Sequence, residues 1–208
     1  MFYEQLILNE RGMRKVIASI NITLDGYCDH EVGIVDEELH QNVNELFRNA
    51  DTAVFGRVTY QLMEDGWPPI VKRPIGNKAI DEFAVLIDNI SKIVFSNTLK
   101  EVEWRNTRLA TGTLEEEVLN LKQQPGKNIL VGGPGIIIEL MELGLIDEYQ
   151  LYVHPIVLGK GNPLFKNITK RLNLHLLKTK VLGTGVVVLY YEPEIEARGK
   201  EQEVRNEE

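Results

Sequence analysis

Three short segments of the chain place glycine and small polar residues directly after apolar runs that have the composition of buried strands. Glycine lets a phosphate come close to the backbone, arginine offers a planar set of donors, and threonine can cap a helix and donate its hydroxyl group. At the carboxyl ends of parallel strands, loop amides and helix N-termini converge on ligands. The segments, which together predict a phosphate-binding site, are Gly56-Arg57-Val58-Thr59, Ser96-Asn97-Thr98 and Gly132-Gly133-Pro134-Gly135.

Taken one at a time, these segments also fit a tight turn, a surface arginine and an ordinary loop. The glycine turn lacks the G-x-G-x-x-G spacing, and the region about twenty residues further on, 152–155, contains no acid for a ribose. No Gly-Lys-Ser/Thr follows the turn, which excludes a P-loop. The predicted phosphate site is therefore not of the usual Rossmann or P-loop kind.

Short apolar runs alternate with helical periodicities through the first two thirds of the chain. Asp36 is placed to cap a helix whose apolar residues recur at helical spacing. Strands that are apolar on both faces indicate a largely parallel sheet covered on both sides by helices. The predicted strands are 15–21, 52–55, 92–95 and 128–131, and the predicted helices are 36–49, 59–64, 78–90, 114–122 and 136–143.

The last third of the sequence changes character, because its strands follow one another with only loops between them. Strands are expected within 149–153, 172–181 and 186–191, and Gly183-Thr184-Gly185 is expected to join the last two as a hairpin. The predicted fold class is α/β, a three-layer α/β/α arrangement with a mostly parallel central sheet and an antiparallel C-terminal hairpin.

Length and composition predict a single domain at 13–192, preceded by a leader at 1–12 and followed by an acidic, disordered tail at 193–208. A net charge of −8 with no concentration of basic residues argues against nucleic-acid binding. No apolar run approaches the roughly 18 to 20 residues of a membrane span, so no membrane association and a cytoplasmic location are expected. Cys28 is the only cysteine, which excludes an intramolecular disulfide and a zinc knuckle, and no metal site is expected.

Six motifs occur in a fixed order between Arg14 and Tyr191. They are INITLDG at 20–26, AVFGRVTY at 53–60, IVFSN at 93–97, ILVGGPG at 129–135, LIDEY at 145–149 and HPIVLGKGNPLF at 154–165. This set resembles the dihydrofolate reductase superfamily. It is more closely similar to the branch that resembles the reductase domain of the bifunctional riboflavin-pathway enzyme. The resemblance is specific for the superfamily and not for a substrate.

The resemblance implies a dihydrofolate-reductase-like fold that binds NADPH and acts on a small heterocyclic substrate, as a homodimer. Gly56, Arg57 and Thr59 would lie near the adenosine-side phosphates, with Ser96 and Asn97 beside them. The diphosphate would lie over Gly132, Gly133, Pro134, Gly135 and Ile136. Ala18, Thr23 and Asp25 would flank the nicotinamide or the substrate, and the loop at 155–165 would help to close the site and the dimer interface.

Two departures from the family's pattern bear on the chemistry. The zinc deaminase signature, a His-x-Glu with a Pro-Cys-x-x-Cys, is absent, so the chain is not expected to deaminate. Dihydrofolate reductases carry an acid on their first helix that helps to protonate the pterin. The corresponding neighbourhood here is near His40, with Glu37 and Glu38 one turn earlier, and this mismatch argues against dihydrofolate itself as the substrate.

Reduction by hydride transfer also needs a proton. The candidate donors are Asp25, Asp29, Glu38 and His40, or a water molecule. Asp25 also fits a turn residue, while Glu38 and His40 also fit a solvated helix face. Trp67, which precedes two prolines, fits either an aromatic wall for a flat substrate or a surface loop packed by its own tryptophan.

These residues leave four hypotheses open. The first, which is our prediction, is an NADPH-dependent reductase of a pteridine-, pyrimidine- or riboflavin-precursor-like ring. The second is a reductase of another small carbonyl or imine, and the third is a nucleotide-binding protein of the same fold that lacks catalysis. The fourth, a nonenzymatic dimeric interaction module, would leave the glycine and arginine positions unexplained.

Overall fold

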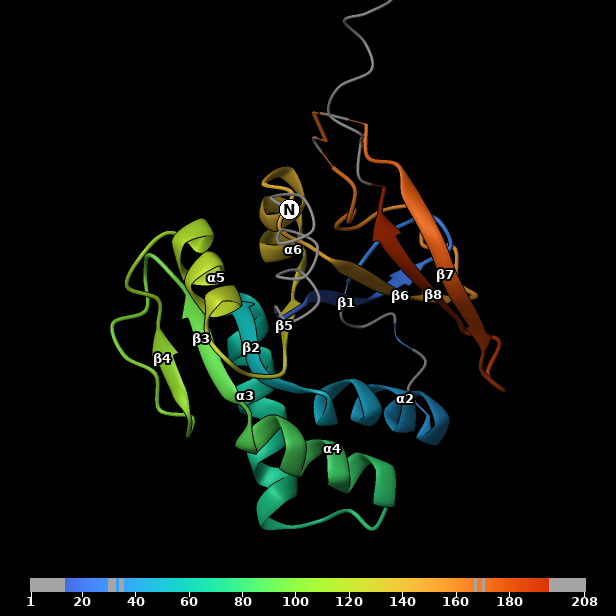
Figure 1. The fold of residues 1–208 in the computed structure, drawn as a ribbon. Helices are drawn as coiled ribbons and strands as arrows, with labels where there is room; N and C mark the ends of the chain where they lie inside the picture. Colours follow the sequence, from blue (N-terminus) through green and yellow to red (C-terminus); the bar gives the residue numbers. More distant parts are fainter. Residues whose placement is uncertain (1–13, 30–32, 34–35, 167, 170, 195–208) are drawn as a thin grey trace, which may run out of the picture.

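The computed structural model describes residues 14–29, 33, 36–166, 168–169 and 171–194, which form one eight-stranded sheet with helices on both faces (Figure 1). The strands are β1 (Val16–Thr23), β2 (Ala50–Gly56), β3 (Ser91–Phe95), β4 (Thr107–Leu109), β5 (Asn128–Gly132), β6 (Glu148–His154), β7 (Leu174–Val181) and β8 (Val187–Pro193). Their order is β4-β3-β2-β5-β1-β6-β8-β7. The predicted leader and nearly all of the predicted tail lie outside the described residues.

The sheet is parallel from β4 to β6 and antiparallel where β8 pairs with β6 and with β7. This confirms the mostly parallel sheet and the C-terminal hairpin. The hairpin closes where the N–H of Gly185, a residue with φ of 85°, donates to the carbonyl of Leu182. The positive φ is the conformation that glycine adopts without steric cost.

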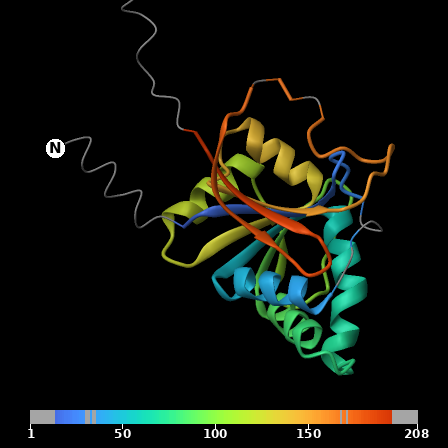
Figure 2. The same ribbon diagram turned by 90° about the vertical axis from the view of Figure 1, so that its right-hand side faces the viewer.

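Helices cover both faces of the parallel part of the sheet. Figures 1 and 2 show α2 and α4 on one side, and α5 and α6 on the other. The helices are α2 (Glu37–Arg48), α3 (Arg57–Lys72), α4 (Lys78–Asn89), α5 (Leu114–Gln123) and α6 (Pro134–Glu142). As predicted, Asp36 caps α2, accepting a hydrogen bond from the N–H of Leu39.

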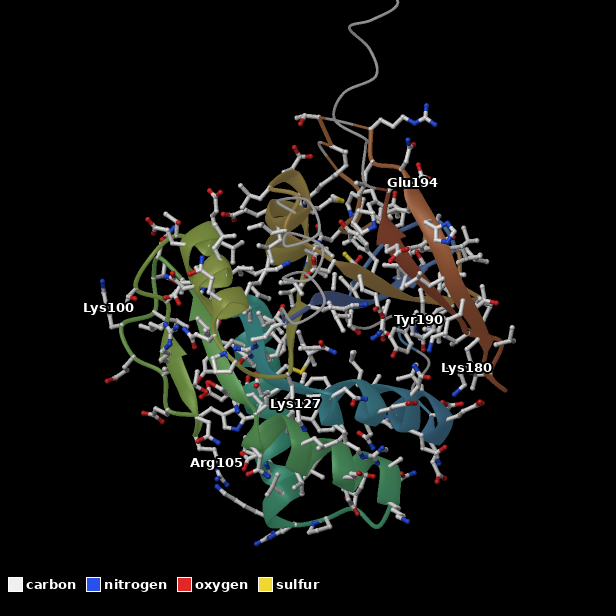
Figure 3. The ribbon with its side chains drawn as sticks, in the orientation of Figure 1. Lys100, Arg105, Lys127, Lys180, Tyr190 and Glu194 are labelled. Carbon is white, nitrogen blue, oxygen red and sulfur yellow. The ribbon has the colours of Figure 1, made fainter. Side chains whose placement is uncertain are left out.

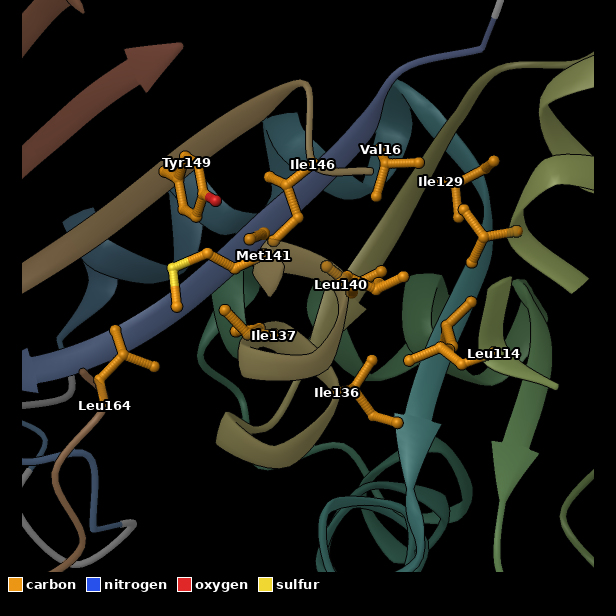
Figure 4. Packing of buried hydrophobic residues seen from close by; sticks show 14 of the residues in the cluster. Val16, Leu114, Ile129, Ile136, Ile137, Leu140, Met141, Ile146, Tyr149 and Leu164 are labelled. Atoms are coloured by element: carbon orange, nitrogen blue, oxygen red, sulfur yellow. The ribbon is translucent and has the colours of Figure 1, made fainter. Parts of the chain in front are cut away.

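Alternate residues of each central strand enter different cores, as the pleat of a sheet requires. In β5, Ile129 and Val131 pack toward α5 and α6, whereas Leu130 packs toward α3 and α4. Figure 4 shows the first of these cores, where Ile136 and Leu140 of α6 lie close to Leu114 of α5. Two separate apolar layers confirm the three-layer arrangement.

A third, smaller cluster lies between α2 and the hairpin, and it contains a buried polar network. The Asn42 amide donates to the hydroxyl groups of Tyr152 and Tyr190, both at 2.9 Å, and its oxygen accepts from Lys180 Nζ at 3.3 Å. Figure 3 labels Lys180 and Tyr190 on the hairpin. Burial raises the pKa of the Tyr152 hydroxyl, so this group stays a neutral donor and acceptor inside the fold.

The structure differs from the sequence prediction in two elements. β4 was not predicted, because its three residues are half-exposed or exposed and pair only with β3. Helix α3 is longer than the predicted 59–64 and continues through Trp67, Pro68 and Pro69, so the surface loop, one of the two interpretations of Trp67, was wrong. Trp67 packs against Phe83 of α4 with ring centroids 4.5 Å apart, and this contact holds the proline-containing end of the helix on the core.

Among the described residues, no helix combines the length and the apolar character that a membrane span requires.

Candidate functional site

A pocket of about 880 Å³ runs along the carboxyl edge of the parallel strands. Because the sheet order places β4, β3, β2, β5, β1 and β6 side by side, segments that follow all six of these strands reach it. Neighbouring strands lie about 4.8 Å apart, so the edge formed by these six strands is roughly 24 Å long. The lining comprises 110–114 after β4, 95–98 after β3, 56–59 after β2, 133–136 after β5, Cys28 and Asp29 after β1, Asn162 after β6, and Glu139 of α6.

Two helices begin in this pocket without a side-chain cap. The N-cap residues of α3 and α6 are Gly56 and Gly133, and neither helix start has a hydrogen bond from a capping side chain. By contrast, α2 and α4 begin away from the pocket and are capped by Asp36 and Asn77. The first-turn N–H groups of α3 and α6, with the positive ends of their helix dipoles, therefore favour an anion in the pocket.

The two glycine-capped starts pack directly against each other. Gly133 has φ of 89°, and a Cβ on this residue would overlap the Oγ1 of Thr59 in α3. At Gly135, two residues further on, a Cβ would meet no atom within 4 Å. Glycine is thus required at 133 for backbone conformation and close packing, while the backbone at 135 is open to the pocket.

Arg57 supplies the only basic side chain among the described residues that line the pocket, and two carboxylates, Asp29 and Glu139, supply the negative charge. The Arg57 side chain is exposed, and its Nη1 donates to Gln61 Oε1 at 2.9 Å within α3. The guanidinium is therefore charged, accessible and next to an uncapped helix start. This combination suits a phosphate group.

A wall of the pocket that the sequence reasoning missed is formed by the loop between β4 and α5. The Glu117 carboxylate, which is 8% exposed, accepts from Arg108 at 2.9 and 2.6 Å and from the N–H of Thr111 at 2.9 Å. The hydrogen bonds from Arg108 lower the pKa of Glu117 to about 2. Thr113 and Glu116 form a capping box at the start of α5, and this Thr-x-x-Glu pattern was the available sequence signal.

Replacing Glu117 with glutamine is expected to destabilise the fold by about 1.5 to 3 kcal/mol at pH 7, the range for hydrogen bonds to a charged group. The folded pKa lies below the unfolded value, so the wild-type advantage is present above pH 4.5 and is lost as the pH falls toward 2. Urea unfolding of both proteins between pH 7 and pH 2.5 measures this difference. A difference in unfolding free energy between the two proteins that stays constant over that range would contradict the role of the ionised carboxylate.

Nine of the predicted cofactor residues line the pocket, and two do not. The nine are Gly56, Arg57, Thr59, Ser96, Asn97, Gly133, Pro134, Gly135 and Ile136. Ala18 has no exposed surface and packs in the α5–α6 core, within the middle of β1. Gly132 ends β5, where a Cβ would lie 3.1 Å from the Phe55 ring.

Thr23 and Asp25 hold two loops together outside the pocket lining. The Asp25 carboxylate accepts from the Thr23 hydroxyl at 2.6 Å and from the N–H groups of Leu158 and Gly159. The hydrogen bond from Thr23 is the main cause that lowers the pKa of Asp25 to about 2. The geometry therefore makes Asp25 an ionised anchor for the loop after β6.

The other predicted functional residues, Glu38, His40 and Trp67, also lie away from the pocket lining. The Glu38 carboxylate accepts from the N–H of Gly183 in the hairpin turn at 2.7 Å. His40 is 5% exposed, its Nδ1 lies 3.0 Å from the Asp36 carbonyl, and its ring packs edge-on against Trp67 and Phe83. The structure thus surrounds His40 with aromatic packing and not with solvent.

Of the four side chains considered as proton donors, Asp29 is the one that lines the pocket. No group of three or more His, Cys, Asp or Glu side chains within the described part of the chain is arranged to hold a metal ion.

The model of the RibD C-terminal domain family matches residues 14–188. YyaP of Bacillus subtilis (strain 168) is 32% identical over 187 residues, with 88% of this chain and 97% of YyaP covered. The diaminohydroxyphosphoribosylaminopyrimidine deaminase/5-amino-6-(5-phosphoribosylamino)uracil reductase of Thermotoga maritima has a TM-score of 0.61 and 19% identity, covering 88% of this chain and 58% of that one. Dihydrofolate reductase of Enterococcus faecalis, solved with NADP(H), has a TM-score of 0.56 and 15% identity, covering 87% and 97%. The two structural likenesses are likenesses of fold.

Proposed function

Because the chain belongs to the RibD C-terminal domain family, a branch of the dihydrofolate reductase superfamily, we propose that it is an NADPH-dependent reductase of a small heterocyclic substrate. The substrate would be a pteridine-, pyrimidine- or riboflavin-precursor-like ring. The observation that carries the proposal is the convergence of two glycine-capped helix starts and Arg57 on one pocket. These groups match the charge and the extended shape of a dinucleotide.

The residues present fit such a cofactor. The open backbone at Gly135 leaves room for a diphosphate against the start of α6, and the positive φ of Gly133 turns the chain into that helix. Arg57, Ser96 and Asn97 would hold the adenosine-side phosphates, beside the wall at 110–114. Once bound, NADPH supplies the hydride, while the protein orients the substrate and excludes water.

A second candidate function is nucleotide binding without catalysis, which the placement of Asp25, Glu38 and His40 outside the pocket lining favours. NADPH would then bind and stay unoxidised with every acceptor offered. The reductase proposal expects oxidation with at least one ring of a panel of pterins, aminouracils and other pyrimidines, followed at 340 nm. We also propose, from length and composition, a single domain at 13–192 and a cytoplasmic location. From the family resemblance alone we propose a homodimer, which sedimentation of the purified protein tests.

Arg57→Ala is expected to weaken NADPH binding by about ten- to a hundred-fold, because it removes a charged hydrogen bond worth roughly 1.5 to 3 kcal/mol. NADH binding should change far less if the guanidinium contacts the 2′-phosphate. Titration calorimetry with both cofactors measures the two losses. The matched control is Arg73→Ala, an exposed arginine at the far end of the same helix. Equal losses for both cofactors would assign Arg57 to the diphosphate, and no loss would remove it from the site.

A further inference from the structure

The proposed cofactor position leaves one end of the pocket for the substrate. The groups assigned to the phosphates lie at the ends of β2, β3 and β5 and at the starts of α3 and α6. Beyond β5, the pocket continues to the ends of β1 and β6, where Cys28, Asp29 and Asn162 line it. Asp29 is the only one of these three that carries a carboxylate.

Asp29 is built into this position by the loop that follows β6. Its Oδ2 accepts from the N–H of Asn162 at 2.9 Å, and a Cβ on Gly161 would overlap the same oxygen. The backbone just before Asp29 pairs with the same loop, with Cys28 N–H donating to the Asn162 carbonyl and Leu164 N–H to the Gly26 carbonyl, each at 2.9 Å. The hydrogen bond from Asn162 and the close approach of Gly161 therefore hold the Asp29 carboxylate in one position.

Further contacts fix the same pair of loops. Asp25 accepts from the N–H groups of Leu158 and Gly159, and the N–H of Leu24 donates to the Ile156 carbonyl at 2.9 Å. Residues 23–29 and 156–164 thus form one hydrogen-bonded unit that carries Asp29 to the pocket. Glycine at 161, with φ of 142°, is what lets the backbone approach the carboxylate this closely.

We propose, on the premise of the proposed function, that Asp29 selects the substrate by accepting hydrogen bonds from its ring N–H or amino groups. A carboxylate accepts only, and it binds two neighbouring donors better than one. The substrate class is therefore a nitrogen heterocycle with adjacent N–H or NH2 donors, such as an aminopyrimidine. A simple carbonyl compound, which offers acceptors only, would find no partner in Asp29.

The test uses the full chain saturated with NADPH and two small probes. 5,6-Diaminouracil carries several donors, whereas 1,3-dimethyluracil has a similar ring and no N–H group. Calorimetric titration of each probe gives its dissociation constant, and titration of NADPH into the same preparations gives cofactor affinity separately. Wild-type protein is expected to bind diaminouracil at least about tenfold more tightly than dimethyluracil.

Two variants and a control test the assignment to Asp29. Asp29→Asn is expected to weaken diaminouracil binding about ten- to a hundred-fold, with NADPH binding changed less than about threefold. Gly161→Ala, which keeps the charge and displaces the carboxylate, should also reduce the preference for diaminouracil. Glu101→Gln removes an exposed carboxylate on the loop before β4 and should alter neither titration. The melting temperature of each variant, with and without NADPH, shows whether it is folded.

The outcomes separate this inference from the proposed function. Absence of NADPH binding in the wild-type protein would contradict the proposed function. Intact NADPH binding with no preference for diaminouracil, or with a preference that Asp29→Asn leaves unchanged, would overturn the role of Asp29 alone. Loss of the preference in Asp29→Asn and Gly161→Ala, with cofactor binding kept, supports it.

Discussion

Gly133→Ala is expected to abolish measurable NADPH binding, a loss of more than about a hundred-fold or about 2.7 kcal/mol, and to destabilise the fold. Two effects add in the folded state. A side chain at φ of 89° costs roughly 1 to 3 kcal/mol, and the new methyl group would overlap Thr59 at the start of α3. Relief of the overlap must turn the Thr59 hydroxyl out of its place or move α3 away from α6, and either change disturbs the groups that face the ligand.

Two other glycine substitutions serve as matched controls for this prediction. Gly144→Ala also places a side chain at positive φ, of 66°, but in open space after α6, so it should cost stability without affecting NADPH. Gly135→Ala meets no protein atom, so any loss of NADPH affinity there reports contact with the cofactor itself. Chemical unfolding and calorimetric titration of the three variants measure both effects. NADPH binding that survives Gly133→Ala would mean that the starts of α3 and α6 do not share a ligand.

Lys92→Met is expected to destabilise the protein by roughly 2 to 4 kcal/mol without altering the pocket. Lys92 has no exposed surface, and its Nζ donates to the carbonyls of Ile87, Asp88 and Ile90 at 2.9 to 3.0 Å. The ammonium also lies 4.4 Å from the centre of the Trp104 ring. Methionine fills the same volume but leaves three carbonyl groups at the end of α4 without a donor.

The charge state and a surface control make this prediction specific. Burial lowers the pKa of Lys92 to about 8, so the ammonium keeps all three of its hydrogens at pH 7. Lys100→Met is the control, because Figure 3 labels Lys100 at the outer edge of the molecule and its side chain is exposed. Urea unfolding at pH 7 measures both variants. If the Lys92→Met protein were as stable as the wild type, the free energy of desolvating the ammonium would equal the stabilisation that its hydrogen bonds provide.

The fold could be predicted where local chemistry and burial agree. Asp36 marks the start of α2 in the sequence, and the fully apolar run of β5 indicates a strand buried on both faces. β4 could not be predicted in the same way, because three half-exposed residues show no periodicity and become a strand only through pairing with β3. The continuation of α3 past Pro68 likewise depends on contacts with α4 that are distant in sequence.

In the candidate site, too, some residues could be recognised from the local sequence, whereas the positions of others depend on distant segments. Glycines and Arg57 after strands were recognisable, because such residues follow several predicted parallel strands whose carboxyl ends meet at one edge of the sheet. The acids were not, since the sequence does not show whether a carboxylate lines the pocket, like Asp29, or lies away from it, like Asp25 and Glu38. Asp29 could be separated from them only by the loop after β6, which is more than a hundred residues away.

The position of β1 in the sheet affects how the chain folds during synthesis. This strand is synthesised before the other described strands, yet it pairs with β5 and β6, so its neighbours are made more than a hundred residues later. Until β5 has been translated, the apolar β1 has no sheet partner, and the segment 133–136 that lines the pocket after β5 has not been made. Topologies dominated by such distant pairings fold slowly, and they expose hydrophobic surface until folding is complete. A nascent chain halted before 128 is therefore expected to recruit chaperones and to lack affinity for any nucleotide.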